Sequence, residues 1–193
     1  MRSSELSNIK KEIRIIAWDD ASFNRNQKRV LVVGVVFRGG SFLDGLLSAI
    51  VEKDGNDATE KIVEIITNSS HHDQLSVIML NGITFAGFNV VDIKKLNKLT
   101  KLPVIVVQRK MPDLKRFSRT LMIFPDKDKK SSAYRNAGDF KSVKINNKIL
   151  FYQSRGIGKD AVEQILKITC IRSTIPEPLR QAHLIASGLK WCE

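Results

Sequence analysis

The first third of the chain alternates between apolar runs of strand length and short polar turns. Residues 13–18 and 30–37 are almost continuously apolar, which predicts two strands. The second run is apolar on both of its faces, so we expect it near the centre of a sheet. Residues 41–52 predict a third, more amphipathic strand, and the turn Arg38-Gly39-Gly40 before it makes the three strands an antiparallel meander.

Between residues 57 and 108 the apolar spacing changes to alternating helices and strands. Asp57-Ala58-Thr59-Glu60 has the form of a capping box, with Asp57 as the helix cap. The isoleucines that follow recur at helical spacing and are expected to face the sheet: Ile62, Ile65 and Ile66. Residues 75–80 and 103–108 predict strands, with a helix over 90–99 between them. Strands joined by such crossovers normally pair in parallel.

The second half of the chain begins with an irregular basic segment, residues 109–141, broken by Pro112 and Pro125 and holding a short helix after Pro112. A hairpin over 142–154 is expected to turn at Asn146-Asn147. Helices are predicted over 159–169 and 176–189, and residues 1–12 form a ragged leader. The fold class is therefore α/β, in a single domain over residues 1–193. A mixed sheet has an antiparallel meander of three strands, then parallel strands, with flanking helices. This pattern is compatible with a ribonuclease-H-like layout.

The charge of the chain is concentrated in one segment. The 193 residues carry a net charge of +12, with a pI of about 9.9. Residues 94–148 hold 16 Lys or Arg against 4 acidic residues, and the rest of the chain balances to zero. This asymmetry favours a polyanionic partner, and the alternative is a solvated lysine-rich surface. No apolar run approaches the roughly 18–20 residues of a membrane span. Two cysteines without metal-ligand spacing, Cys170 and Cys192, favour the reducing cytoplasm.

Acidic residues gather where predicted strands end. Asp19 and Asp20 end the first strand, and because adjacent strand residues point to opposite faces, only one can aim at a given site. Further oxygen donors follow the third and fourth strands: Glu52, Asp54, Asp57 and Asn81. Oxygen ligands at neighbouring strand ends suit Mg²⁺ or Mn²⁺, and two such ions can activate water for phosphodiester hydrolysis. The alternative is that these residues are turns, caps and solvated surface.

Two other segments have features of a nucleic-acid surface. The loop 81–89 follows a buried strand and contains Phe85 and Phe88, which could stack on bases or belong to the core. Arg109 and Lys110 leave the fifth strand and could hold phosphate oxygens. The Arg155-Gly156-Ile157-Gly158-Lys159 segment lacks the full spacing of a phosphate loop, and we interpret it as a helix start. His71-His72 is interpreted as surface loop and His183 as a structural residue of the last helix.

Several of these segments resemble endonuclease V. Ile175 to His183 is similar to that family's P-E-P-x-R-x-A segment, and Ala17 to Phe23 resembles its first strand. Leu80-Asn81-Gly82 resembles its V-D-G strand end, and Pro103 to Lys110 its P-x-I-G-V-A-K-K strand. The runs 57–61 and 81–93 look typical of an archaeal family of unassigned function with an endonuclease-V-like fold.

The resemblance implies a ribonuclease-H-like fold and Mg²⁺-dependent nuclease ancestry, with nucleic acid as partner. It places the first metal-binding aspartate on Asp20 and the second on Asn81, a neutral ligand. The metal-binding glutamate corresponds to Glu52 or Asp57, and a lysine to Arg109. A histidine falls near Arg155, which adds Arg155 to the nucleic-acid-binding candidates. Gly40-Ser41-Phe42 stands where that family has its base wedge.

The sequence supports two functional hypotheses. The first is a nucleic-acid-binding, divalent-metal-dependent phosphodiester hydrolase, in which Asp20, Asp57 and Asn81 are catalytic and Asp20, Glu52, Asp57 and Asn81 hold Mg²⁺ or Mn²⁺. The second is a non-catalytic nucleic-acid-binding module on an inherited nuclease scaffold, which the neutral Asn81 motivates.

Overall fold

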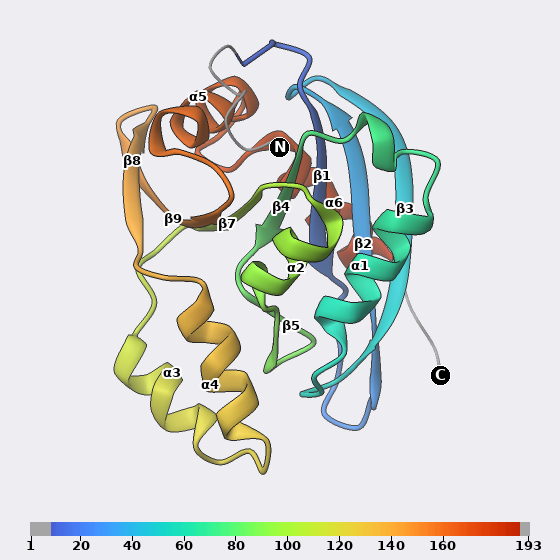
Figure 1. Cartoon of the computed structure of the whole chain (residues 1–193), viewed down its shortest axis with the longest axis vertical. Helices are drawn as coiled ribbons and strands as arrows, with labels where there is room; N and C mark the ends of the chain where they lie inside the picture. The colour runs from blue at the N-terminus through green and yellow to red at the C-terminus, as the bar shows by residue number, and fades with distance from the viewer. Residues whose placement is uncertain (1–8, 190–193) are drawn as a thin grey trace.

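The fold is built on a mixed sheet of seven strands, shown in a computed structural model that describes residues 9–189 (Figure 1). The strand order is β3-β2-β1-β4-β7-β9-β8. The strands are β1 (Arg14–Asp20), β2 (Arg29–Arg38), β3 (Phe42–Glu52), β4 (Val77–Asn81), β7 (Val104–Gln108), β8 (Lys141–Ile145) and β9 (Lys148–Arg155). A separate ribbon pairs β5 (Thr84–Phe85) with β6 (Asn89–Val90).

The pairing confirms the predicted fold class. β1, β2 and β3 form the antiparallel meander, and β1, β4 and β7 pair in parallel. β9 is antiparallel to both β7 and β8, and the β8–β9 hairpin turns at Asn146 and Asn147, which both have positive φ as a type I′ turn requires. The polar residues that follow β1, β4 and β7 therefore leave the same edge of the sheet.

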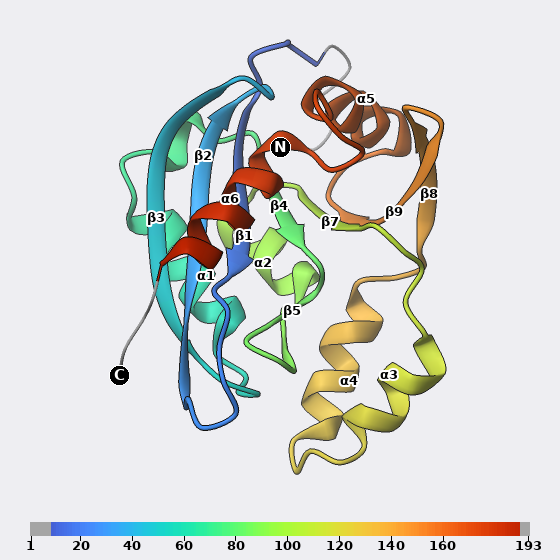
Figure 2. The same ribbon diagram turned by 180° about the vertical axis from the view of Figure 1, so that it is seen from behind.

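Helices cover both faces of the sheet. α1 (Ala58–Asn68) and α2 (Ile93–Thr100) pack on one face, where β1 contributes Ile16 and Trp18. α5 (Lys159–Thr169) and α6 (Glu177–Gly188) lie on the other face, over Ile15 and Ala17 (Figure 2). A short 3₁₀ helix, η1 (His72–Gln74), precedes β4. Among residues 9–189 no helix has both the length and the apolar character to cross a membrane.

The basic segment is more regular than its sequence predicts. It holds the expected helix after Pro112, α3 (Leu114–Leu121), and also α4 (Lys127–Asn136). α4 has the sequence KDKKSSAYRN, which lacks an apolar repeat, and it buries only Lys130 and Ala133. Its helical state therefore depends on tertiary contacts that periodicity does not reveal.

The start of α1 differs from the predicted capping box. Asp57 precedes the helix but makes no side-chain cap. The backbone N–H of Ala58 donates instead to Oδ1 of Asn89, at 3.1 Å. Asp57 was therefore wrongly predicted as the cap, because a side chain 31 residues further along the chain supplies the acceptor. The predicted leader (1–12) lies mostly outside the described residues, as does Cys192.

Gly34 provides a test of packing beneath the sheet. A Cβ atom at Gly34 would lie 2.7 Å from Cζ2 of the buried Trp18. We expect Gly34→Ala to lower the free energy of unfolding by about 1–3 kcal/mol, measured by urea denaturation, because the indole has no room to move. Gly188→Ala is the control, since nothing lies within 4 Å of its Cβ position. Equal stabilities of the two variants would contradict this account.

Candidate functional site

The best-organised polar group in the structure lies where β1 and β4 end. The register pairs Trp18 with Leu80, so Asp19 and Asn81 follow side by side. Oδ2 of Asp19 accepts hydrogen bonds from Nδ2 of Asn81 at 2.8 Å and from Nδ1 of His183 at 2.8 Å. Oδ1 accepts from the backbone N–H of Asp20 at 3.0 Å. The Asp19 side chain is buried, so three donors hold one carboxylate in a fixed orientation.

α6 delivers His183 to this carboxylate. Near the start of the helix the buried Glu177 accepts a hydrogen bond from Nε of Arg180 at 2.8 Å, and this pair lies within the first turns of α6. The hydrogen bond from Arg180 lowers the pKa of Glu177, so the ion pair is present at neutral pH. The side chain of His183 is 52% exposed, while its Nδ1 points inward to Asp19. The imidazole therefore connects the buried carboxylate to solvent.

Sequence reasoning did not place Asp19 or His183 among the candidate ligands. Asp20 was chosen over its neighbour, and His183 was predicted to be structural. The alternation of side chains along each strand could have indicated this site. Asp19 points to the same face of the sheet as Ala17, and Asn81 points to the same face as Met79. This is the face that α6 covers. The contact to His183 spans 164 residues, which periodicity cannot reveal.

Asp20 points to the opposite face of the sheet. Its Oδ2 accepts a hydrogen bond from the backbone N–H of Ala86 at 2.7 Å. Burial raises the pKa of Asp20 to about 6, and the neighbouring Asp19 charge adds to the effect. The two adjacent aspartates therefore serve different faces, and Asn81 joins Asp19 instead of Asp20.

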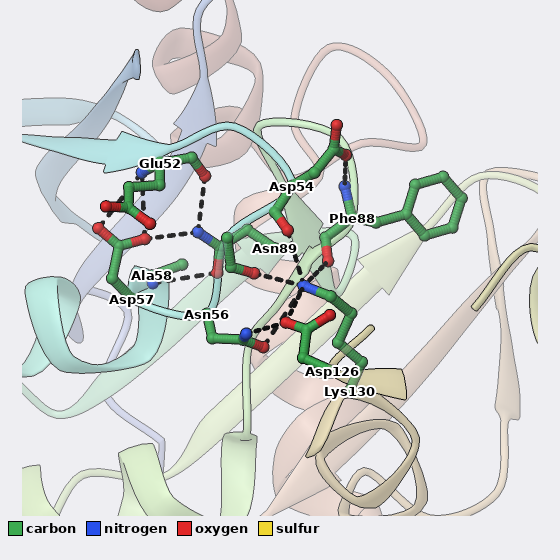
Figure 3. Close-up of polar contacts among 10 residues, drawn as sticks. Glu52, Asp54, Asn56, Asp57, Ala58, Phe88, Asn89, Asp126 and Lys130 are labelled. Carbon is green, nitrogen blue, oxygen red and sulfur yellow. Dashed lines mark hydrogen bonds and ion pairs between the residues drawn. The ribbon is translucent and has the colours of Figure 1, made fainter. Parts of the chain in front are cut away.

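The other predicted ligands form a second group on the face of Asp20. Asp57 accepts hydrogen bonds from the backbone N–H of Glu52 and, at 2.6 Å, from Nδ2 of Asn89 (Figure 3). Asp54 accepts from the backbone N–H of Phe88 at 2.8 Å. These contacts tie the β3–α1 loop to the loop between β5 and β6. The structure thus gives Asp57 a structural role in this corner and does not bring Asp57 or Glu52 to Asn81.

A buried lysine lies at the centre of this second group. Lys130 is fully buried, and its Nζ donates to the backbone oxygens of Asp54 (2.8 Å), Gly55 (2.5 Å) and Phe88 (3.0 Å) (Figure 3). It also pairs with Asp126 at 3.2 Å. Although burial opposes the shift, a hydrogen bond from Asn56 and the contact with Lys130 lower the pKa of Asp126. The ammonium group thereby fastens α4 to both loops.

Neither phenylalanine of the loop 81–89 is free to stack on a base. Phe85 is fully buried in the core. Phe88 packs against Phe117 and Phe124, with ring centroids 5.7 and 5.3 Å away. The core alternative left open by the sequence is therefore the better description of both residues.

The predicted cationic residues separate into two places. Arg109 and Lys110 are exposed directly after β7, at the edge where β1 and β4 also end. Arg155 pairs in register with Val104, at the other end of β7. Its guanidinium donates to the backbone oxygen of Asn136, at the end of α4, at 3.0 Å. Arg155 thus supports α4, and Arg109 and Lys110 remain the cations beside the strand ends.

A divalent cation site needs several oxygen or nitrogen ligands close together. Among residues 9–189 no three His, Cys, Asp or Glu side chains gather as a metal site. The nearest arrangement is Asp19 with the imidazole of His183 and the amide of Asn81. Mg²⁺ often takes one or two carboxylates and completes its shell with water and substrate phosphates. In this arrangement both oxygens of Asp19 accept hydrogen bonds, so residues 9–189 show no preformed metal cage.

The chain is similar to a family model and to archaeal proteins over nearly its whole length. The family model described as Endonuclease dU matches residues 11–190. The chain belongs to the Endonuclease dU family. It is 49% identical over 191 residues to the UPF0215 protein of Methanothermobacter thermautotrophicus, covering 98% of this chain and 93% of that one. The resemblance to an archaeal family related to endonuclease V is thus confirmed.

Solved structures of similar proteins have the same fold. A protein of unknown function from Archaeoglobus fulgidus has a TM-score of 0.83 and 33% identity, over 91% of this chain and 97% of that one. Endonuclease V of Ciona intestinalis, in complex with inosine-containing DNA, has a TM-score of 0.58 at 13% identity, over 88% and 82%. The second likeness shows the fold, which is ribonuclease-H-like.

The pKa of Asp20 gives this Endonuclease dU family member a pH-dependent stability. Folding raises that pKa from 3.8 to about 6, so the native state retains a proton that the unfolded chain releases. The contribution is present below pH 3.8 and is lost as the pH rises through about 6. Asp20→Asn keeps an oxygen acceptor for Ala86 and should be more stable than the parent above pH 6, by about 1–2 kcal/mol.

This pH dependence is measured by urea unfolding in EDTA across the acid to neutral range. The exposed Asp139→Asn is the control and should retain the slope of the parent protein. Parallel stability curves for Asp20→Asn and the parent would show that the carboxyl group of Asp20 does not titrate differently on folding.

Lys130 provides a second stability test. Lys130→Met leaves Asp126 and three carbonyl oxygens without their buried cation, so we expect a loss of about 3–5 kcal/mol in the free energy of unfolding. Lys129→Met removes the same charge at an exposed neighbouring position and should change stability by less than about 0.5 kcal/mol. A loss of the same size in both variants would argue against the role of Lys130.

Proposed function

We propose that this chain binds nucleic acid along the edge where β1, β4 and β7 end, and hydrolyses a phosphodiester bond there. The observation that carries the proposal is the convergence of Asn81 and His183 on the buried Asp19 at that edge. Membership of the Endonuclease dU family and the net charge of +12 support it. The DNA bound to a structural neighbour of the same fold supports it further.

The side chains at this edge have different roles in the proposed reaction. With Nδ1 of His183 engaged by Asp19, Nε2 is the ring nitrogen left to take a proton from the attacking water. Asn81 fixes the other side of the Asp19 carboxylate. Arg109 and Lys110, exposed directly after β7, contact the phosphate chain, whereas Asp20 points to the other face of the sheet.

Asp19 and Asn81 would hold a Mg²⁺ or Mn²⁺ ion together with substrate phosphates, and the ion would supply Lewis-acid stabilisation of the developing charge on phosphate oxygens. The proposed ligand set replaces the predicted one. Asp57 and Glu52 are left out of this proposed set because their contacts lie within the β3–α1 corner and do not include Asn81.

The proposed substrate class is nucleic acid that contains a deaminated base. The family description refers to dU, and the structural neighbour was solved with inosine. Uracil and hypoxanthine both carry a carbonyl group where the parent base has an amine, so one recognition chemistry serves both. Endonucleases of this kind are expected to act on a base displaced from the stack.

A second function remains a candidate because of Asn81. A neutral amide stands where the endonuclease V resemblance has an aspartate, and it binds a hard cation less tightly than a carboxylate does. In this alternative the chain is a non-catalytic nucleic-acid-binding module that needs no metal.

A cleavage assay separates the two functions. The substrates are labelled single strands and duplexes that contain deoxyuridine, inosine or only normal bases, each with Mg²⁺, Mn²⁺ or EDTA. We expect cleavage that requires the metal and that falls by about 10²–10⁴-fold in His183→Ala, because proton transfer is lost. Asp19→Asn should fall similarly, since a neutral amide no longer stabilises the imidazolium that forms when His183 takes the proton.

Leu184→Ala, at an exposed neighbouring position of α6, is the matched control and should cleave like the parent. Binding of the same substrates is measured in parallel by fluorescence anisotropy. Binding without cleavage in every condition would support the non-catalytic module. Cleavage that is unaffected by His183→Ala and Asp19→Asn would place the chemistry elsewhere.

A further inference from the structure

α3 and α4 form an arm that extends from the sheet at the end where the loops around Asp54 and Phe88 lie (Figures 1 and 2). Here the arm denotes residues 109–140. It is firmly attached: Lys130 binds both loops, Phe117 and Phe124 pack on Phe88, and Phe117 packs on Tyr134 at 4.5 Å. Asn136 donates to Asp92 at 2.8 Å. The arm thus has a fixed position relative to the sheet edge.

The outer surface of this arm exposes large apolar side chains. Of the eight residues of α3, only Leu121 is buried. Met122 is 60% exposed and Ile123 is 80% exposed, the highest value for a large apolar side chain among residues 9–189. The adjacent Phe124 turns inward to Phe88. Folding therefore does not account for the apolar pair Met122-Ile123, and contact with a partner would.

The two helices that flank this apolar pair along the chain are rich in cations. Residues 109–141 contain ten Lys or Arg against four acidic residues. Two of those acids are engaged within the fold, because Asp113 caps α3 and Asp126 pairs with Lys130. The exposed cations of the two helices are Lys115, Arg116, Arg119, Lys129 and Arg135. Two apolar side chains beside many positive charges are complementary to a nucleic-acid duplex. In a duplex, negatively charged phosphate chains enclose apolar stacked bases.

We infer that the arm is a nucleic-acid wedge, with Met122 and Ile123 inserting between base steps while Arg116 and Arg119 contact phosphates. Apolar side chains inserted in this way unstack and kink a duplex. The inference rests on the proposed function, since it assumes that the edge beside the arm binds the same nucleic acid. Because Lys130 attaches the arm to the two loops, the wedge would set the spacing between the unstacked step and the cleaved bond.

The wedge is tested with a duplex that contains deoxyuridine beside a 2-aminopurine, whose emission rises when the base is unstacked. The parent protein should raise the emission several-fold. The double variant Met122→Ser with Ile123→Ser should lose this rise and bind about 10-fold more weakly. The control, Ile149→Ser with Ile171→Ser, removes two exposed apolar residues outside the arm and should behave like the parent.

The phosphate contacts are tested through the salt dependence of binding. Arg116→Gln with Arg119→Gln should reduce the slope of log affinity against log salt by about 2, because each lost phosphate contact contributes about 0.9. Lys144→Gln with Lys148→Gln, two exposed lysines on the β8–β9 hairpin, should leave the slope unchanged.

The outcomes separate the wedge from the proposed function. If the parent binds the duplex and both arm variants match it in emission and salt slope, the wedge is overturned while nucleic-acid binding stands. If the parent binds neither duplex nor single strand at low salt, the proposed function fails first. If Met122 and Ile123 are needed for binding to phosphatidylserine vesicles and not to the duplex, the arm is a membrane contact and the inference is overturned.

Discussion

The buried contacts of the Lys130 ammonium group hold together the two loops and the helix that lie around Asp54 and Phe88. Removing a charge from water costs several kcal/mol, and only close oxygen partners offset that cost. Lys130 has such partners in three backbone carbonyls and in Asp126. They belong to the β3–α1 loop, the β5–β6 loop and α4. One buried cation therefore brings together segments that the sequence separates by up to 76 residues.

The effect of this cation extends to the sheet edge. Ala86 accepts a hydrogen bond from the backbone N–H of Asp54 at 2.8 Å and donates its own N–H to Asp20. Lys130 in turn holds the backbone oxygen of Asp54. The orientation of Asp20 is thus linked through two loops to the docking of α4. On the other face, α6 positions His183 against Asp19 without any contribution from the arm.

The sequence predicted what short-range patterns determine. Residues 30–37 and 159–169 have unambiguous periodicity, and both elements form where expected. α4 was missed because its stability comes from Lys130, a residue whose type predicts exposure. Asp57 was misassigned as a cap because Asn89, distant in sequence, replaces it. The meeting of Asp19 with His183 depends on how α6 lies on the sheet, which neither composition nor spacing encodes.

The neutral side chain of Asn81 has two opposing effects in the proposed function: weaker binding of a metal ion and weaker repulsion of phosphates. A carboxylate there would hold a divalent cation more tightly, but it would add a third negative charge beside Asp19 and Asp20 where phosphates must approach. An amide lowers that repulsion and donates the hydrogen bond that orients Asp19. In the proposed function, the exposed cations of the arm, Arg109 and Lys110 among them, would supply fixed positive charge for the phosphates. The concentration of positive charge within residues 94–148 would then offset the weaker metal binding expected of a neutral Asn81.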